Sequence, residues 1–394
     1  MNIHGKLKGK SCWIYTKIFL VFESTLLVMC LLCITQEAHA EDYDKSWLLS
    51  KFNDFDLVTN NGDGYSKYTN ETGALAWSES YILDAYLDMY EATRDDKYLD
   101  KFVIHVDRII ANTDVNRGVS DYKGRSAVGW SATIYSKNGE RIIWLVHTGM
   151  ITYPLVRFAL IVQTDNVITY KNKAEYFMQI SEEALSFFDR NWIQDDKLGE
   201  GYYQFDVDSP HTTNVDPPMP VPFNQQLAAG RTFLVLYQLT NKRFFYEKAE
   251  GLARHFIHRL RKEINGTCTW NYSYDKGFKE CNAVEDISHG ATDIDFAVLA
   301  YRNGIIFNKE DIFHFINTYK INIHKNGKFA NTVSGIGEGT YKESIGRWLE
   351  LSKFDCFIWN NFYDMVKNDN LSGGVEILLG IAKLLKYWDR CNKQ

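Results

Sequence analysis

The fold is decided by the stretch YILDAYLDMYEATRDDKYLDKFVIHVDRII at residues 81–110. Apolar residues recur every three to four positions on both sides of its polar centre, a period that predicts two helices joined as a hairpin. The second half of the stretch returns at residues 236–257 as LYQLTNKRFFYEKAEGLARHFI. Matching residues lie 147 positions apart: Tyr90 with Tyr237, Thr93 with Thr240, and Lys101 with Lys248.

Two weaker copies extend the repeat. YKNKAEYFMQISEEALSFF (170–188) contains the K-A-E of 248–250 again, and FAVLAYRNGIIFNKEDIFHFINTY (296–319) follows the same pattern more loosely. The first helix of each hairpin is almost wholly apolar, whereas the second carries charge on one side, so we expect buried inner helices and amphipathic outer ones. Hairpins that bury one another's apolar faces form an array, either an open solenoid or a closed ring. We predict an all-α, two-layer toroid of the (α/α)6 type, with a small β-hairpin near residues 268–281.

The bulk composition limits the classes of function. The 394 residues are 45% hydrophobic with only 6 prolines, which is typical of a well-packed globular chain. Four lysines, an apolar run and the tripeptide AHA ending at Ala40 predict a signal peptide over residues 1–40, with an uncleaved membrane anchor as the alternative. We therefore expect a single exported domain over 41–394, secreted or periplasmic. Without the leader, 40 Lys and Arg face 48 Asp and Glu, a net charge of −8 that argues against nucleic acid as a partner.

Four cysteines remain in the mature chain, an even number that fits an exported protein. Cys268 and Cys281 flank a predicted β-hairpin that a disulfide could span, and a Cys356–Cys391 bridge would then tie down the C-terminal helix; the sequence alone does not specify either pairing. The mature chain has no C-x-x-C motif, so a cysteine zinc site is not expected. N-x-S/T sequons occur at Asn70, Asn265, Asn271 and Asn370.

Chemically varied residues recur where the first helix of each hairpin begins. The four copies read ALAWSES (74–80), VHTGMIT (146–152), VPFNQQL (221–227) and EDISHGA (285–291). Six polar residues fall within about one turn of the same helix end: Glu79, His147, Asn224, Gln226, Asp286 and His289. If the ring closes, these side chains converge on one mouth.

At this point the chain resembles the (α/α)-toroid enzymes that act on carbohydrates, which include polysaccharide lyases and unsaturated-glycoside hydrolases. The resemblance covers roughly residues 70–385 and rests on W-S-E-S-Y, P-F-N-Q-Q and E-D-I-S-H at the starts of inner helices. It implies an oligosaccharide or polysaccharide substrate. The spacing E-D-x-x-H also suits a metal, but no H-E-x-x-H motif or second nearby histidine accompanies it, so we expect neither metal nor cofactor.

Elimination in a uronic-acid polysaccharide is the favoured reaction. Asn224 and Arg347 would neutralise the uronate carboxylate, and His289 or His147 would remove the C5 proton. Tyr202 or Tyr203, on the neighbouring EGYYQF segment, would then protonate the departing oxygen. Each of these residues could instead have a purely structural role. Asn224 suits a helix N-cap, a histidine often only makes a structural hydrogen bond, and a tyrosine pair often only packs in the core.

Hydrolysis is the main alternative. Glu79 would pair with Glu285, Asp286 or Asp293, and their separation would decide inversion or retention. Glu79 could equally offset a helix dipole. Trp77, Trp348 and Gln226 are candidate sugar contacts in either reaction, and Asp293 and Asp295 are the likelier structural acids. A third hypothesis is a non-catalytic helical array that binds glycans or a protein.

Overall fold

The computed structural model describes residues 43–212, 219–273, 283–369 and 374–392. The predicted signal segment 1–40 lies outside these residues. The chain divides into two compact units, Met1–Asp44 and Lys45–Gln394. The described helices and strands belong to the second unit.

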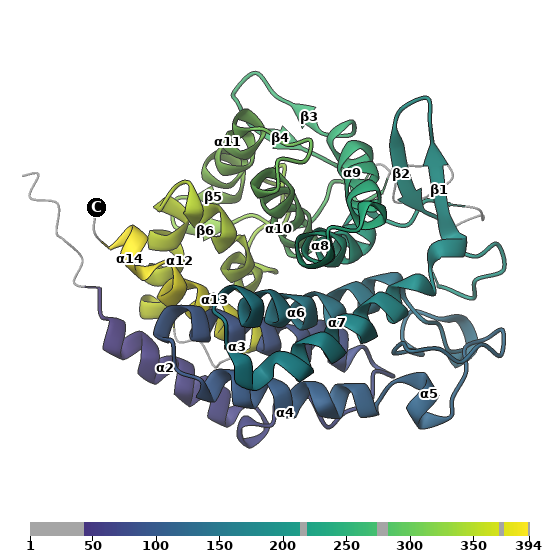
Figure 1. The fold of residues 1–394 in the computed structure, drawn as a ribbon. Helices are drawn as coiled ribbons and strands as arrows, with labels where there is room; N and C mark the ends of the chain where they lie inside the picture. The colour runs from purple at the N-terminus through teal and green to yellow at the C-terminus, as the bar shows by residue number, and fades with distance from the viewer. Residues whose placement is uncertain (1–42, 213–218, 274–282, 370–373, 393–394) are drawn as a thin grey trace, which may run out of the picture. The chain divides into compact units, whose positions relative to one another are not determined.

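Six inner elements form a closed ring in the second unit (Figure 1). They are α3 (Ser80–Thr93), α6 (Leu145–Thr164), α8 (Phe223–Thr240), α10 (Ile287–Arg302), the 3₁₀ helix η7 (Lys342–Lys353) and α13 (Val375–Lys386). Each packs against the next, and α13 packs against α3. A short π-helix, η2 (Leu75–Glu79), leads into α3 and also contacts α6. The ring rather than the solenoid is therefore correct, and the predicted (α/α)6 toroid is confirmed.

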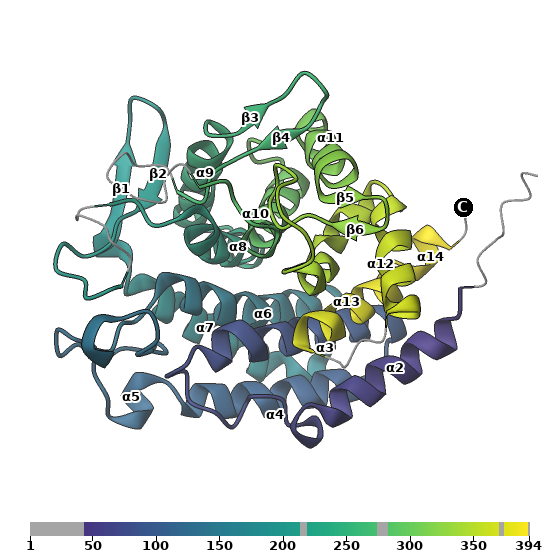
Figure 2. The same cartoon turned by 180° about the vertical axis from the view of Figure 1, so that it is seen from behind.

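An outer helix packs against each inner element (Figure 2). These helices are α2 (Lys45–Val58), α4 (Lys97–Ala111), α7 (Lys171–Ser186), α9 (Arg243–Ile257), α11 (Lys309–Asn317) and α12 (Phe357–Asn368). The inner helices are buried on most sides, whereas the outer helices bury one face only, as predicted. Shorter helical segments complete the chain: η1 (Asn60–Gly62), α5 (Asp114–Arg117), η3 (Lys137–Gly139), η4 (Ile168–Tyr170), η5 (Asp189–Asn191), η6 (Thr318–Ile323) and α14 (Trp388–Cys391).

The repeat extends to the way in which the helices end. Arg94 after α3 and Asn241 after α8 lie 147 positions apart, and both adopt a left-handed conformation with φ of 60° and 54°. Each donates its backbone N–H 2.8 Å to a carbonyl one turn back, of Tyr90 and of Tyr237 respectively. The two hairpins thus share one C-cap geometry at equivalent positions.

The described strands form three two-stranded antiparallel sheets. They pair β1 (Trp192–Asp195) with β2 (Glu200–Tyr203), β3 (Arg261–Lys262) with β4 (Cys268–Thr269), and β5 (His324–Lys325) with β6 (Lys328–Phe329). Of the β-hairpin predicted near 268–281, residues 274–281 lie outside the described residues. On either side of that gap, Tyr272 donates to the Ala283 carbonyl and Glu285 to that of Trp270, so the pairing leading into it is antiparallel.

The tightest contact in the ring joins α6 to α8. A side chain at Gly149 would place its Cβ 2.3 Å from the backbone nitrogen of Ala229, so only glycine allows the two helices to approach this closely. By length and composition α6 would suit a membrane span, but it is mostly buried inside the protein. It is a core helix of this unit.

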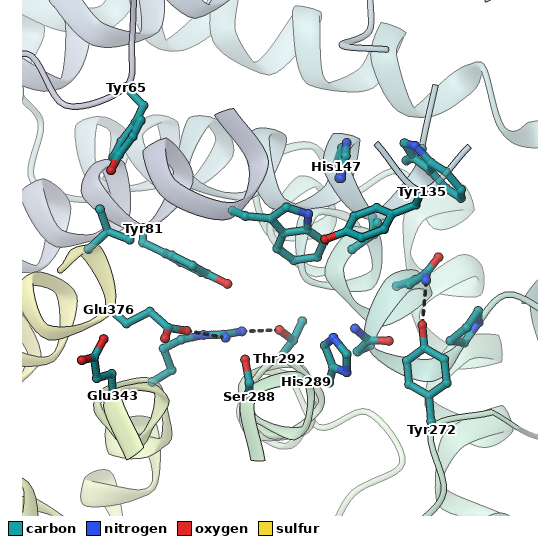
Figure 3. A pocket seen from close by; sticks show the side chains of 18 of the residues that line it. Tyr65, Tyr81, Tyr135, His147, Tyr272, Ser288, His289, Thr292, Glu343 and Glu376 are labelled. Carbon is teal, nitrogen blue, oxygen red and sulfur yellow. Dashed lines mark hydrogen bonds and ion pairs between the residues drawn. The ribbon is translucent and has the colours of Figure 1, made fainter. Parts of the chain in front are cut away.

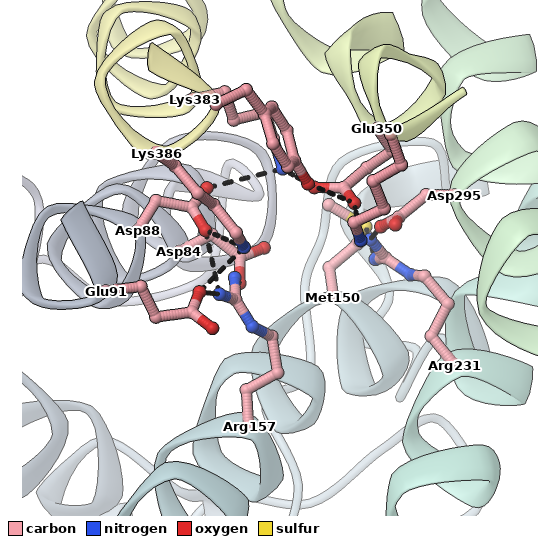
Figure 4. A network of polar contacts seen from close by, with 12 residues as sticks. Asp84, Asp88, Glu91, Met150, Arg157, Arg231, Asp295, Glu350, Lys383 and Lys386 are labelled. Atoms are coloured by element: carbon pink, nitrogen blue, oxygen red, sulfur yellow. Dashed lines mark hydrogen bonds and ion pairs between the residues drawn. The ribbon is translucent and has the colours of Figure 1, made fainter. Parts of the chain in front are cut away.

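Charged side chains join the inner helices on the side of the ring where α3, α6 and α13 end (Figure 4). Lys383 of α13 lies between Asp88 of α3 and Glu350 of η7, while Lys386 contacts Asp88 at 2.6 Å. Burial alone would raise the pKa of Asp88, but the surrounding cations, Lys383 first among them, hold it below its usual value. Buried charge is thereby paired across three inner elements.

Two further arginines continue the same pattern. Arg157 of α6 contacts three acids of α3, Asp84, Asp88 and Glu91, at 2.8–2.9 Å. Arg231 of α8 binds Asp295 of α10 at 2.6 Å, a pairing that fits the structural role expected for that aspartate.

One of the two predicted disulfides is present. Cys356 and Cys391 are bonded and join the start of α12 to the C-terminal α14. Cys268 is a buried free thiol, and Cys281 lies outside the described residues, so the second predicted bridge is not supported.

We predict that Lys383→Met lowers the free energy of unfolding by about 3–5 kcal/mol, because it leaves two buried carboxylates without their shared cation. Denaturant unfolding at neutral pH measures this, with Lys97→Met as the control at an exposed ion pair. The pKa values of Asp88 and Glu350 are lowered in the fold, so the difference should shrink as the pH falls below about 4. A loss no larger than that of the control would contradict a structural role for the network.

Candidate active site

A cavity of about 650 Å³ opens where the six inner elements begin (Figure 3). Starts of inner elements supply most of its lining, namely Trp77, Tyr81, Trp144, Val146, His147, Pro222, Asn224, Gln225, Ser288, His289, Thr292, Glu343, Arg347, Gly374, Val375 and Glu376. Loops add Tyr65, Tyr135, Phe205, Thr212 and Tyr272. The predicted common mouth therefore exists, and His147, Asn224 and His289 all reach it.

His289 is held as a cation at this mouth. Its Nδ1 lies 2.9 Å from Asp286 Oδ2 and 3.4 Å from Glu285 Oε1. Burial by itself would lower the pKa of His289, but the two carboxylates outweigh it and raise the pKa to about 10. The half-buried ring also packs on Tyr272, with centroids 5.3 Å apart. At neutral pH this histidine has no free lone pair with which to accept a proton.

The carboxyl groups behind His289 are buried. Burial raises the pKa of both Glu285 and Asp293, and the Trp270 indole N–H donates to Asp293 at 2.8 Å. Glu285, Asp286 and His289 place three potential ligand atoms within 4.8 Å of one another, so these are the described residues that could hold a metal ion. A metal there would have to replace the proton on His289 Nδ1.

His147 differs from His289 in its protonation. It is fully buried, and burial lowers its pKa to about 3, so the ring is neutral. Its Nδ1 lies 3.1 Å from the Asn70 amide nitrogen, while its Nε2 has no partner among the described residues. The edges of Trp77 and Trp144 surround the ring, with centroids 5.4 and 6.3 Å away.

Asn224 is not the N-cap of α8. Pro222 occupies the N-cap position, and Asn224 lies two residues inside the helix. It is 3% exposed, and its Oδ1 has no hydrogen-bond partner among the described residues. A buried amide oxygen costs free energy when it lacks a partner, so this side chain is available to a ligand.

Arg347 and Glu376 occupy the other end of the cavity. Arg347 contacts Glu376 at 3.1 Å and donates to the Thr292 hydroxyl at 2.6 Å, and its guanidinium lies 4.7 Å from the centre of the Tyr81 ring. Ser344 also donates to Glu376. Figure 3 shows Glu343 beside Glu376, at the same end of the cavity as Tyr81. The cavity thus has one end with two carboxylates and another with two histidines.

Two predicted residues, Glu79 and Trp348, lie close in sequence to residues that line the cavity but do not line it themselves. Glu79 is fully buried, binds His105 Nδ1 at 2.6 Å and accepts the Tyr65 backbone N–H, so its predicted place at the mouth is wrong. Residues two positions apart on a helix point to nearly opposite sides, so Trp77 faces the cavity and Glu79 faces α4. Trp348, beside Arg347, is buried in the core and donates to the Ile287 carbonyl at 2.8 Å.

Gln226 is a further predicted residue that does not line the cavity, whereas the residue next to it does. Gln226 is fully buried and joins the Tyr203 N–H at 3.1 Å to the Val221 carbonyl at 2.8 Å, a structural role that corrects the predicted sugar contact. Its neighbour Gln225 lines the cavity and donates to the Tyr272 hydroxyl at 3.0 Å.

The predicted rim tyrosines are also structural. Tyr203 is fully buried against Trp192 and Phe233, and Tyr202 stacks on His255 with centroids 4.8 Å apart. They belong to β2, which packs against α9 rather than lining the cavity. Asp286 does not line the cavity either. It caps α10 by accepting the N–H groups of Ser288 and His289, both at 2.8 Å, and it holds His289 through the ion pair at Nδ1.

Glu343 and Glu376 were not predicted as site residues. The segment SGGVEILLGIAKLLKYW is as apolar as the recognised inner helices, and the rule that located His147 would have selected Glu376 at its start. Glu343 begins η7, a 3₁₀ helix whose tighter period departs from the repeat pattern.

No protein-family model matches this chain, and no curated protein sequence matches it. Solved structures do. The GH76A α-1,6-mannanase from Salegentibacter sp. HEL1_6 superposes with a TM-score of 0.53 at 15% identity, covering 87% of this chain and 97% of its own. A sugar epimerase from a ruminal bacterium gives 0.52 at 11% identity, covering 79% and 86%, and the cellobiose 2-epimerase of Spirochaeta thermophila gives 0.50 at 13%, covering 80% and 85%. These likenesses show that the chain has the same (α/α)6 toroid fold.

Proposed function

We propose that this protein is a glycoside hydrolase that binds a neutral oligosaccharide or polysaccharide in the cavity at the start of the inner helices. The observation that carries the proposal is the pair of carboxylates, Glu343 and Glu376, in a cavity that is otherwise lined mainly by aromatic rings and neutral polar groups. Two carboxyl groups are what hydrolysis of a glycosidic bond requires. Aromatic side chains provide flat apolar surfaces for sugar rings.

The two carboxylates have different surroundings. Arg347 and Ser344 hold Glu376 in one place, which suits the base or nucleophile of the pair. Glu343 lines the cavity and has no ion pair among the described residues, and we assign it the other role, protonation of the leaving oxygen. Glu285 and Asp293, considered earlier for this role, are buried behind His289 and do not line the cavity.

The protonation of the two histidines argues against elimination. A lyase needs a base that can accept the C5 proton. His289 already carries its proton at neutral pH, and His147 is a buried imidazole whose Nδ1 is occupied. Sugar epimerisation would need the same kind of base. We therefore place hydrolysis before the elimination that the sequence favoured.

Charge pairing supports a neutral substrate. Arg347 and His289 are the cationic side chains among the described residues that line the cavity, and both already face carboxylates. A uronate would find no unpaired cation there. Among the relatives by structure, a variant of the mannanase was solved with α-1,6-mannotriose, which supports a glycan ligand in this fold. We also propose that the chain is exported, on the sequence of residues 1–40.

We predict that incubation with neutral glycans, among them α-mannans, releases reducing ends without ultraviolet-absorbing unsaturated products. Reducing-sugar assay and absorbance, run in parallel, measure the two. Alginate and glucuronan serve as the uronate controls and should give neither signal. Unsaturated products from a uronate would contradict hydrolysis, and an epimerised sugar without cleavage would contradict it as well.

We predict that Glu376→Gln and Glu343→Gln each lower kcat by about 10²–10⁴-fold, because each removes one acid–base or nucleophilic group while keeping its shape. Glu338→Gln, at an exposed ion pair with Lys328, is the matched control and should keep full activity. Circular dichroism checks that all three variants fold. Retention of activity in either cavity variant would exclude that carboxylate from the reaction.

We predict that the positive charge of His289 sets an alkaline limit of activity near pH 10. The pKa of His289 is raised in the fold, so the charge is present below that value and is lost as the pH rises through it. His289→Gln should remove this limb and lower activity at all pH values, whereas His258→Gln, outside the cavity, should leave the profile unchanged. An alkaline limb near pH 6.5 that vanishes in His289→Gln would show the histidine to be unpaired.

A further inference from the structure

We propose that Asn70 is a positioning residue that fixes His147 as a neutral Nε2–H donor in the cavity. The identity of the ligand that this donor would bind rests on the proposed function, whereas the protonation of the ring does not. Asn70 lies in the loop before η2, is fully buried and does not line the cavity itself. It therefore acts on a ligand only through His147.

The orientation of the Asn70 amide is determined by two backbone groups. Its Oδ1 accepts the Ala76 N–H at 3.3 Å, and its Nδ2 donates to the Trp130 carbonyl at 2.8 Å. Turning the amide over would bring an oxygen against the Trp130 carbonyl and a nitrogen against the Ala76 N–H, which loses both bonds. The atom that faces His147 Nδ1 at 3.1 Å is therefore an amide N–H donor.

An N–H donor at Nδ1 decides where the ring proton lies. A neutral imidazole has one N–H and one acceptor nitrogen. Since Nδ1 accepts from Asn70, the proton of His147 is on Nε2. Burial keeps the ring neutral, so it has no second proton to distribute.

The residues packed around the His147 ring leave its Nε2 without a hydrogen-bond partner among the described residues, so this nitrogen can bind a ligand. The side chain itself is fully buried at the wall of the cavity. Gly73 permits the arrangement: it has φ +78°, and a Cβ there would lie 2.7 Å from Trp77 and 3.6 Å from His147. A buried N–H without a partner costs free energy in the empty cavity, and an oxygen of the ligand would recover it.

The ligand atom that suits this donor is a neutral oxygen, such as a sugar hydroxyl. A neutral imidazole N–H donates a hydrogen bond but does not release its proton at working pH, so His147 orients the substrate without serving as its acid or base. Asn224 lines the same cavity with an unpartnered amide oxygen. Together they offer one donor and one acceptor, which is the pair that a hydroxyl-bearing ring can satisfy.

The ring nitrogens of His147 in the unliganded, full-length protein test the proposal directly. Protein labelled with ¹⁵N-histidine is recorded in two-bond ¹H–¹⁵N spectra, and the signals that vanish in His147→Gln belong to this ring. We expect a protonated Nε2, an unprotonated Nδ1 and no change between about pH 5 and pH 8. A proton on Nδ1, or a titration within that range, would overturn the proposal. Because no substrate is present, the result is independent of whether the protein hydrolyses glycans.

Asn70→Asp tests the positioning step. The carboxylate keeps the shape of the amide but replaces the donor by an acceptor, so the His147 proton should move to Nδ1 or the ring should become charged. The spectra should show this change, and KM for the glycan should rise about tenfold, the size of one lost hydrogen bond, with a smaller effect on kcat. Asn112→Asp, at a helix C-cap outside the cavity, is the matched control. An unchanged His147 spectrum in folded Asn70→Asp would refute the role of Asn70, and if that variant does not fold, the wild-type spectrum decides.

Discussion

Closure of the inner ring is the constraint on which the rest of the structure depends. Six elements can surround one axis only if the side chains that face it are neutralised or packed. Buried charge pairs do this near the ends of the inner helices, where Lys383 joins α3, α13 and η7 and Arg157 joins α3 to α6. Such pairs add little net stability against an apolar core, but removing one partner is costly. They therefore fix which helices are neighbours.

The opposite ends of the same helices carry the candidate chemistry. All six inner elements begin at the cavity, so a small set of residues at helix starts is collected from distant parts of the chain. The surroundings then separate groups of the same type. Two carboxylates next to His289 make it a cation, whereas an amide and two indole rings keep His147 neutral. Identical residues thus enter the cavity with different capacities to donate and accept.

The repeats made the ring predictable, because the spacing of apolar residues reveals both the length of each helical hairpin and the buried face of each helix. Periodicity also located the helix end at which polar residues gather, which brought in His147, Asn224 and His289. It could not give the rotation of each helix about its axis. Neighbouring residues on a helix point in different directions, and this explains why Gln225 lines the cavity whereas the predicted Gln226 does not, and why of the predicted pair Arg347 and Trp348 only Arg347 reaches it.

The last two inner elements escaped recognition for a different reason. η7 is a 3₁₀ helix, whose period differs from that of the recognised copies, and α13 (Val375–Lys386) did not match the repeated hairpin motif in the sequence. Their side chains, Glu343 and Glu376, are the ones on which the proposed hydrolysis rests. The tyrosines of β2 were placed wrongly at the rim, because no sequence pattern shows that a short β-hairpin packs against an outer helix.

The position of Asn70 has a consequence for how the protein can be made. Asn70, Glu71 and Thr72 form an N-x-T sequon, yet the asparagine is fully buried and its amide is committed to Trp130 and His147. A glycan attached there during synthesis would be far too large for the site, and the modified amide would lack a hydrogen for one of its two bonds. A eukaryotic secretory host that recognised this sequon would therefore trap the chain before the loop ahead of η2 could close. A host without asparagine-linked glycosylation avoids that competition between modification and folding.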